Sequence, residues 1–325
     1  MRTLFRVITA LTAGAAVGAL AQNAQFTNMV RLTNNEFALR FAAPAGSYYR
    51  IDASTNLDAP TNQRWSSMLT LQSAGVNQHT DSAAPFNVSR FYRAEQLTGS
   101  NILTGDHLAT TNGDVVFHSV GHASFVMRWN DKWIYNDPTN APFGYEGFPK
   151  ADLILISHSH GDHYSASSIG LLLATNGIVI APQAVYDQTS FAPYRSSAIV
   201  LNYGVSTNVI GVIVQAVAAY NANHAFGINN AYVTTIGGKR IFTSGDCGDG
   251  PEIRALTNID VAFLCMNRQF TMNWLNATNV IRSMRPNVVY PYHYREGNGD
   301  RTNAALFKQN LGPDTGIEVR YQKWY

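Results

Sequence analysis

Residues 157–164 read Ser-His-Ser-His-Gly-Asp-His-Tyr and bring four side chains that can bind a metal ion close together in the sequence. These side chains are His158, His160, Asp162 and His163. An aliphatic run over 151–156 precedes them and is typical of a buried strand. Alternate residues of a strand share a face, so the first two histidines should point the same way, and Gly161 permits the bend that returns the other two ligands. Imidazole and carboxylate together suit zinc, iron or manganese, so this segment predicts a metal site.

The spacing of these residues matches the H-x-H-x-D-H signature of the metallo-β-lactamase superfamily. From about Asp114 to Tyr325 the chain resembles the branch that includes the ascorbate-lactone hydrolase-like and the N-acyl-phosphatidylethanolamine phospholipase D-like proteins. Further landmarks follow in the order of that family. They are Gly121-His122-Ala123-Ser124-Phe125, Asp137-Pro138, the signature itself, Tyr220-Asn221 with His224, Phe242-Thr243-Ser244-Gly245-Asp246, Met272, and Tyr290-Pro291-Tyr292-His293-Tyr294.

The resemblance implies a site for two divalent metal ions, with zinc expected first and manganese or iron also open. It assigns His158, His160 and His224 to one ion. It assigns Asp162, His163 and His293 to the other, with Asp246 between the two. Asp162 is also the expected catalytic residue, because a carboxylate there would orient the nucleophile or carry its proton. Three more residues are expected beside the ligands or on the substrate side: His118, His122 and Asp137.

A site of this kind predicts a hydrolase that uses a metal-bound hydroxide to cleave an ester, lactone, amide or phosphodiester bond of a small molecule. The first residues of the chain, described below, predict that this hydrolase is exported. The fold hosts many activities, so the substrate does not follow from it. Two alternatives remain open at this point. One is a non-catalytic metal-binding or ligand-binding protein on the same fold, and the other is a di-iron redox enzyme. Metal content and a panel of generic substrates distinguish them.

The first residues of the chain resemble a secretory signal. Arg2 and Arg6 form a basic start, residues 7–20 are apolar and rich in Ala and Gly, and Ala19-Leu20-Ala21 is a cleavage site of the A-x-A type. The apolar stretch is too short for a convincing membrane span. We therefore expect residues 1–21 to be a signal peptide, and the mature chain to be periplasmic or extracellular and to lack a membrane span.

Charge and length limit the other possibilities. The full chain has a formal net charge of +2, and loss of the two signal arginines would leave acidic and basic residues in balance. Without a basic patch or tail, nucleic acid is not an expected partner. The 325 residues suffice for a large domain and a small one. Cys247 and Cys265 would enter an oxidising compartment after export, and whether they form a disulfide stays open.

Differences in residue composition and in hydrophobic pattern along the sequence indicate two domains. Residues 22–105 are rich in Asn, Ser and Thr, with short alternating strands, and predict a small β-sandwich that resembles an accessory module of exported bacterial proteins. Residues 106–325 alternate strand and helix patterns, including a helix over 165–174 and a hairpin at Gly237-Gly238. The fold class is therefore α/β (α+β). The resemblance implies an αβ/βα metallo-β-lactamase sandwich after the small all-β domain.

Overall fold

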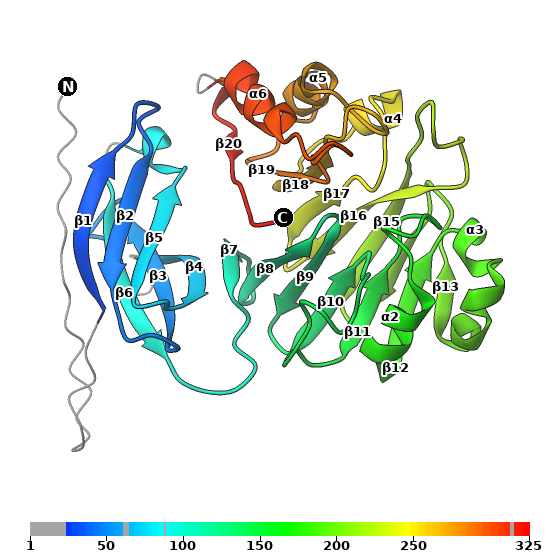
Figure 1. Ribbon diagram of the computed structural model, residues 1–325, viewed down its shortest axis with the longest axis horizontal. Helices are drawn as coiled ribbons and strands as arrows, with labels where there is room; N and C mark the ends of the chain where they lie inside the picture. Colours follow the sequence, from blue (N-terminus) through cyan, green and yellow to red (C-terminus); the bar gives the residue numbers. More distant parts are fainter. Residues whose placement is uncertain (1–23, 61–64, 88, 313–314) are drawn as a thin grey trace. The chain divides into compact units, whose positions relative to one another are not determined.

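The computed structural model describes residues 24–60, 65–87, 89–312 and 315–325. The expected signal peptide, residues 1–21, lies outside them. The chain forms two compact units that meet in sequence between Ala109 and Thr110 (Figure 1). The sequence-based boundary was placed at Gly105, whereas the residues that follow it form a strand that pairs within the first unit. Among the described residues, no helix has the length and apolar character needed to cross a membrane.

The N-terminal unit is built from two antiparallel sheets. One has the order β1-β2-β5 and the other runs β7-β4-β3-β6. The strands are β1 (Gln25–Arg31), β2 (Phe37–Ala42), β3 (Tyr48–Ser54), β4 (Ser66–Gln72), β5 (Val76–Asp81), β6 (Phe91–Leu97) and β7 (Gly105–Ala109), with a short 3-10 helix at Ala84–Phe86. Phe41 of one sheet packs with Tyr49 and Ile51 of the other in a buried cluster, so the alternating apolar residues form a core between two β-layers.

The sequence did not predict β1 and β5. Both strands carry mainly polar or exposed side chains, and strand patterns are read from apolar alternation. Their pairing with β2 is what completes the first sheet.

The C-terminal unit has two larger sheets that pack face to face. The first has the order β13-β12-β11-β10-β9-β8, and the second runs from β14 to β20 in sequence order. Phe263 joins them, since its ring stacks on Phe125 with centroids 4.3 Å apart and meets Phe117 edge-on at 5.3 Å. The strands of the first sheet are β8 (Asp114–Gly121), β9 (Ser124–Trp129), β10 (Lys132–Asn136), β11 (Ala151–Leu155), β12 (Leu173–Ala181) and β13 (Ala198–Val200). Those of the second are β14 (Ser206–Val209), β15 (Val212–Ala218), β16 (Asn230–Ile236), β17 (Lys239–Thr243), β18 (Val261–Cys265), β19 (Val288–Tyr292) and β20 (Glu318–Val319).

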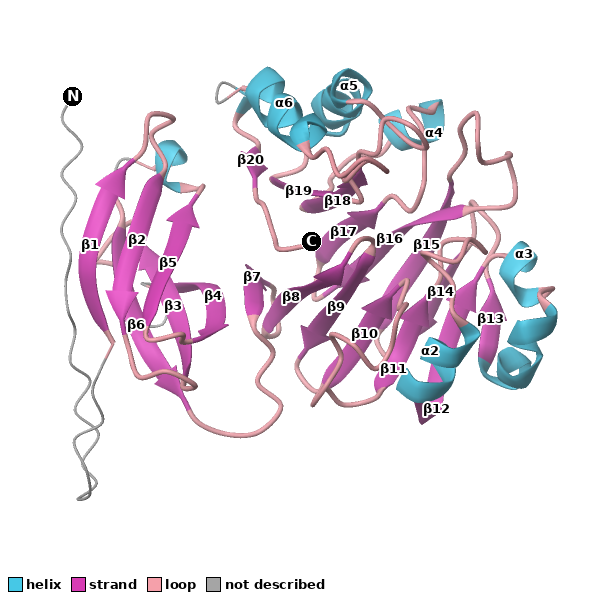
Figure 2. Ribbon diagram, viewed as in Figure 1, coloured by secondary structure: helices cyan, strands magenta, loops and turns pink. Residues whose placement is uncertain are grey.

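Helices accompany each sheet of this unit. Figure 2 shows α2 and α3 beside β11 to β13, and α4, α5 and α6 beside β17 to β20. The helices are α2 (Ala166–Leu172), α3 (Gln183–Tyr186), α4 (Pro251–Arg254), α5 (Trp274–Met284) and α6 (Thr302–Leu311), with a 3-10 segment at Thr189–Ser197. Two packed sheets with helices outside them confirm the predicted αβ/βα sandwich.

Local signals account for several boundaries. Ser165 caps α2, because its side chain accepts a hydrogen bond from the backbone N–H of Ser168. The helix ends at Leu172, two residues earlier than predicted, because β12 begins at the next residue. Gly237 and Gly238 have φ of +53° and +80°, the left-handed values that a two-residue hairpin turn requires. The hairpin of β16 and β17 therefore forms where the sequence predicted it.

Candidate metal centre

The potential ligands lie on loops that leave the ends of strands. The segment from His158 to His163 follows β11, Asp246 follows β17, and His293 directly follows β19. His224 comes from the loop between β15 and β16, where Asn221 and His224 form an isolated bridge. Strands that run parallel bring their carboxyl ends to one edge of a sheet, so loops far apart in sequence meet there.

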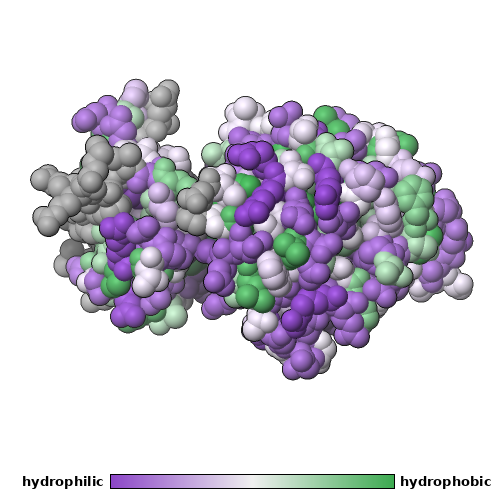
Figure 3. All heavy atoms as spheres, turned by 90° about the horizontal axis from the view of Figure 1, so that it is seen from above, coloured by the Kyte–Doolittle hydropathy of each residue, from purple (hydrophilic) through white to green (hydrophobic). Residues whose placement is uncertain are grey.

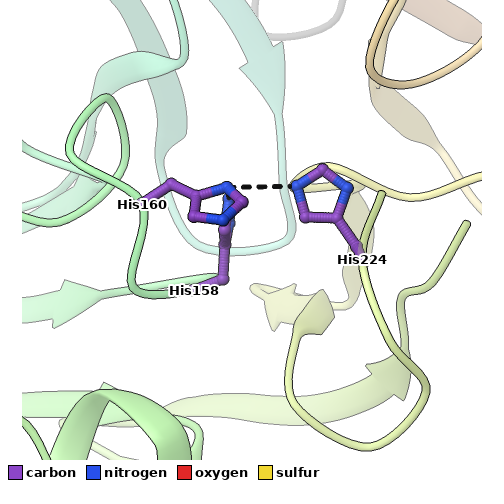
Figure 4. A group of neighbouring side chains, drawn as sticks. All are labelled: His158, His160 and His224. Carbon is purple, nitrogen blue, oxygen red and sulfur yellow. Dashed lines mark hydrogen bonds between the residues drawn. The ribbon is translucent and has the colours of Figure 1, made fainter. Parts of the chain in front are cut away.

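One cluster consists of three histidines, drawn in Figure 4. The Nδ1 atom of His160 lies 3.1 Å from Nε2 of His158 and 3.2 Å from Nε2 of His224. His158 and His224 are buried, whereas His160 is exposed. Three imidazole nitrogens that converge from two loops, with one side open, match the way in which a catalytic metal ion is held.

Asp246 stands between this cluster and two further histidines. Its Oδ2 atom is 3.5 Å from Nε2 of His224. Its Oδ1 atom is 3.2 Å from Nε2 of His163 and 3.5 Å from Nε2 of His293. The two oxygens of one carboxylate thus face two different sets of imidazoles.

Asp162 belongs to the second set. Its Oδ2 atom lies 3.0 Å from Nε2 of His122 and 3.3 Å from Nε2 of His293, and these three residues form another group of converging ligand atoms. The Asp162 side chain is 47% exposed, unlike Asp246, which is buried. Asp162 is therefore the carboxylate of the centre that an incoming molecule can reach.

Two buried atoms that face one another at the centre, Nε2 of His163 and Oδ1 of Asp246, lack hydrogen-bond partners, as does Nδ1 of His293. Buried polar atoms are usually satisfied, and an orphaned pair calls for an explanation. Both are ligand atoms, and together with His158 they form a third converging group. A divalent cation between them would satisfy both, so the residues present fit the metal that the sequence predicted.

A buried carboxylate, Asp137, holds these ligands in place. Its Oδ1 atom accepts the backbone N–H of Ser157 at 2.7 Å, and its Oδ2 atom lies 2.8 Å from Nδ1 of His163. The Ser157 hydroxyl also donates to Asp137 and lies 3.0 Å from Nδ1 of His158. These contacts orient the rings of His158 and His163 through their Nδ1 atoms. The Nε2 atoms of both rings are left directed at the centre. This role of Ser157 was not predicted from the sequence.

Burial and charge set the ionisation of the centre. Burial, with the positive charge of His163, lowers the pKa of His158 to about 2, so this imidazole is neutral at physiological pH. Burial opposes the ionisation of Asp246, but His163 and His293 outweigh it and lower the pKa of that carboxyl. Burial likewise lowers the pKa of His224. Burial opposes the protonation of His163 and His293, but Asp246 outweighs it and raises their pKa. Neutral imidazoles and an ionised carboxylate are the forms that bind a metal ion, so a bound cation would displace the protons of these two rings.

Unusual backbone conformations occur at the same place. His122, Asp137 and His293 have φ of 54°, 42° and 49°, a region that residues other than glycine seldom adopt. Gly245 also has a positive φ, and a Cβ there would lie 2.8 Å from Cβ of Ser157. The β11 and β17 loops therefore approach too closely for a side chain, which places Asp246 against the histidines.

Two expectations about histidines change. His118 and His122 lie four positions apart and were both expected beside the ligands or on the substrate side, but they do not share a strand face, because β8 has a bulge between Ser119 and Gly121 and ends there. His122 instead lies in the turn that follows and faces Asp162. His118 meets the ring of Phe148 edge-on at 5.1 Å and belongs to none of the three ligand groups.

The two cysteines lie beside the centre without forming a bridge. Cys247 and Cys265 are both buried and free, and the Cys265 thiol donates to the backbone carbonyl of Cys247 at 3.5 Å. Neither cysteine is in a ligand group.

Comparison with known proteins agrees with this geometry. Residues 117–293, more than half of the chain, match the model of the beta-lactamase superfamily domain. The chain belongs to the beta-lactamase superfamily. The matched segment runs from β8 to His293 and contains every expected ligand.

Relatives of this superfamily protein carry similar descriptions. This chain is 28% identical over 216 residues to a UPF0173 metal-dependent hydrolase of Pyrococcus abyssi, and the match covers 62% of this chain and 93% of the relative. A protein of the same description from Thermococcus kodakarensis is 30% identical over 220 residues, covering 62% of this chain and 93% of the relative. The crystal structure of a proposed metal-dependent hydrolase from Parabacteroides distasonis is 31% identical and has a TM-score of 0.60, covering 69% of this chain and all of that one.

Proposed function

We propose that this protein is a binuclear metal-dependent hydrolase that acts on a small molecule. The observation that carries the proposal is the position of Asp246, whose two carboxylate oxygens face different histidines. The descriptions of the Pyrococcus and Thermococcus relatives as metal-dependent hydrolases support it. A carboxylate whose two oxygens face two sets of imidazoles is the arrangement expected of a ligand shared by two cations.

The contacts support the division of ligands that the sequence implies. His158, His160 and His224 would hold one ion, as their mutual contacts suggest. Asp162, His163 and His293 would hold the other, and Asp246 would serve both. We propose zinc as the first candidate, because nitrogen-rich sites with carboxylates suit it, while manganese and iron also accept such ligands.

Bound cations of this kind would supply Lewis acidity and lower the pKa of water. The protein's own part is to position that chemistry. Asp137 fixes the ring of His163, and the buried walls around Asp246 keep the local dielectric low. The exposed side of the centre, at His160 and Asp162, is where a substrate would enter.

Asp162 is the proposed catalytic residue. Burial opposes its ionisation, but hydrogen bonds from His122 and His293 prevail and lower its pKa, so the carboxylate is ionised. An ionised, accessible carboxylate can accept a proton from the attacking water and pass it to the leaving group. The overall reaction adds water across an ester, lactone, amide or phosphodiester bond. We place the protein with the ascorbate-lactone hydrolase-like and phospholipase D-like branch on the ordered landmarks of its sequence.

A substrate panel tests the proposal directly. The protein, purified and loaded with zinc or manganese, would be incubated with chromogenic esters, a lactone, an amide and a phosphodiester. We expect turnover of at least one class, its loss on treatment with a chelator, and its recovery on addition of the metal. Absence of turnover on every class, by a protein shown to hold metal, would favour a binding protein instead.

We also propose that the protein is exported. The proposal rests on the basic start, the apolar run and the Ala19-Leu20-Ala21 site, which predict a mature chain that begins at Gln22. Intact-mass analysis of material from the native host checks this. A soluble cytoplasmic species that still begins with Met1 would contradict it.

A further inference from the structure

Two arginines stack on one tyrosine at the edge of the metal centre. The guanidinium carbons of Arg295 and Arg301 lie 4.5 Å and 5.2 Å from the ring centroid of Tyr325. Both arginines are exposed. Among the residues that the structure describes, neither guanidinium forms a salt bridge with a carboxylate. The stacking orients these groups and leaves their N–H edges available to a ligand.

The acids of this neighbourhood are already paired. Arg268 forms salt bridges with Glu296 at 3.1 Å and with Asp300 at 2.5 Å. Asp300 also accepts the backbone N–H of Thr302 at 2.8 Å. Three arginines, Arg268, Arg295 and Arg301, thus stand against the two carboxylates, so a net positive charge remains on these five side chains.

Tyr325 connects these arginines to the centre. Its hydroxyl lies 3.1 Å from Nδ1 of His122, and the Nε2 atom of the same ring lies 3.0 Å from Asp162. The backbone N–H of Arg295 donates to the Tyr325 hydroxyl at 3.4 Å, and Arg295 follows the proposed ligand His293 by two positions. The guanidinium groups thus border the side of the centre that Asp162 opens to solvent.

We propose that Arg295 and Arg301 form a subsite for an oxyanion, a carboxylate or phosphate group that the substrate carries in addition to the bond that is cleaved. The inference rests on the proposed hydrolase function and deepens it. Arginine presents paired N–H donors that match the two oxygens of such a group. The face of the molecule that carries α5 and α6 is mostly hydrophilic in Figure 3, which suits a charged ligand better than an apolar one.

A purely structural role makes a different prediction. If the two arginines only packed against Tyr325, their loss would disturb the centre and affect every substrate equally. If they bind an oxyanion, their loss would affect anionic substrates alone. The experiment therefore compares substrates that differ only in that group.

The metal-loaded protein would be assayed with three nitrophenyl esters of similar length, ending in a methyl, a carboxylate or a phosphonate group. The variants are Arg295→Ala, Arg301→Ala and their combination, with Arg282→Ala as the matched control, since Arg282 is an exposed arginine of α5 that donates to the carbonyl of Asn310. We expect the double variant to lose about 10- to 100-fold in kcat/KM on an anionic ester, mainly through KM, and less than about twofold on the neutral ester. The anionic ester with the larger loss identifies the natural group.

Equal losses on neutral and anionic esters, or no loss on either anionic ester, would overturn the subsite. Calorimetric titration with glutarate and with phenylphosphonate supplies a readout that does not depend on turnover. Binding that is at least about tenfold weaker in the double variant than in wild type supports the subsite, and equal or undetectable binding in both overturns it. If no ester is cleaved by metal-loaded wild type, the hydrolase proposal fails, while the titration still decides on the arginines.

Discussion

Asp137 and His163 are both fully buried, and an oxygen of the Asp137 carboxylate lies 2.8 Å from Nδ1 of the imidazole. This pair fixes the ring whose other nitrogen has no hydrogen-bond partner and faces Asp246. The metal centre therefore depends on a residue that belongs to an earlier loop, between β10 and β11, and that is not itself a proposed ligand.

Replacement of this carboxylate should loosen the metal. We expect Asp137→Asn to lower metal affinity by about 10- to 100-fold, because the amide has one acceptor oxygen, whereas the two carboxylate oxygens serve the backbone N–H and hydroxyl of Ser157 and the ring of His163. Competition with a chromogenic chelator measures the affinity. Asp152→Asn is the control, since that carboxylate accepts the backbone N–H of Trp133 instead. Unchanged affinity in Asp137→Asn would show that the pair is dispensable for binding.

Asp162→Ala should abolish turnover while the fold persists. The side chain is 47% exposed, so its loss removes little from the apolar core. We expect turnover to fall by about 10²- to 10⁴-fold and metal content to decrease. Circular dichroism and elemental analysis accompany the assay. His79→Ala, on β5 of the N-terminal unit, is the control, and equal damage there, or full activity in Asp162→Ala, would refute the assignment of ligands.

A buried ion pair makes the N-terminal unit sensitive to acid. Burial opposes ionisation of Asp81, but the charge of Arg90 and hydrogen bonds from Arg90 and Tyr92 lower its pKa in the folded state. The folded pKa thus lies below the unfolded value of about 3.9, so the stabilisation is complete above that pH and is lost as the pH falls below it. Asp81→Ala should cost about 3–5 kcal/mol of unfolding free energy at neutral pH.

Thermal melting of wild type and Asp81→Ala at a series of pH values checks this. The gap between their melting temperatures should stay constant from neutral pH down to about 4 and narrow below it. Asp58→Ala, at an exposed position, should melt like wild type throughout. A gap that widens in acid would contradict the sign of the shift.

The buried thiols should be free and unreactive in the folded protein. Both thiols are buried and out of reach of a reagent, and the hydrogen bond with Cys265 together with burial raises the pKa of the Cys247 thiol. A thiol reagent should react slowly with the native protein and should titrate both cysteines after denaturation without reductant. No thiols in the denatured sample, with recovery on reduction, would instead reveal a disulfide.

The sequence predicted the parts of the centre that are contiguous in the chain. His158 to His163 follow one strand, so the strand end and Gly161 were enough to predict a metal site. Their meeting with His224, Asp246 and His293 followed only from the family resemblance, because contacts between loops of two sheets leave no local pattern. The contact between Tyr325 and His122 could not be predicted from local pattern either, because the two residues are 203 positions apart in the sequence.

The strand prediction failed for related reasons. β1 and β5 have few buried apolar residues, so alternation could not reveal them, and their place depends on pairing with β2. The bulge in β8 also has no signature in sequence, and it changed the neighbours expected for His118 and His122.

Metal stoichiometry tests the central claim most directly. Elemental analysis of the protein, dialysed after loading with zinc, should give about two equivalents per chain in wild type and about one or fewer in Asp246→Ala, because that carboxylate is proposed to serve both ions. Asp152→Ala should match wild type. A wild type that retains no more than about one equivalent, or an Asp246→Ala variant that still retains about two, would contradict a binuclear centre bridged by Asp246.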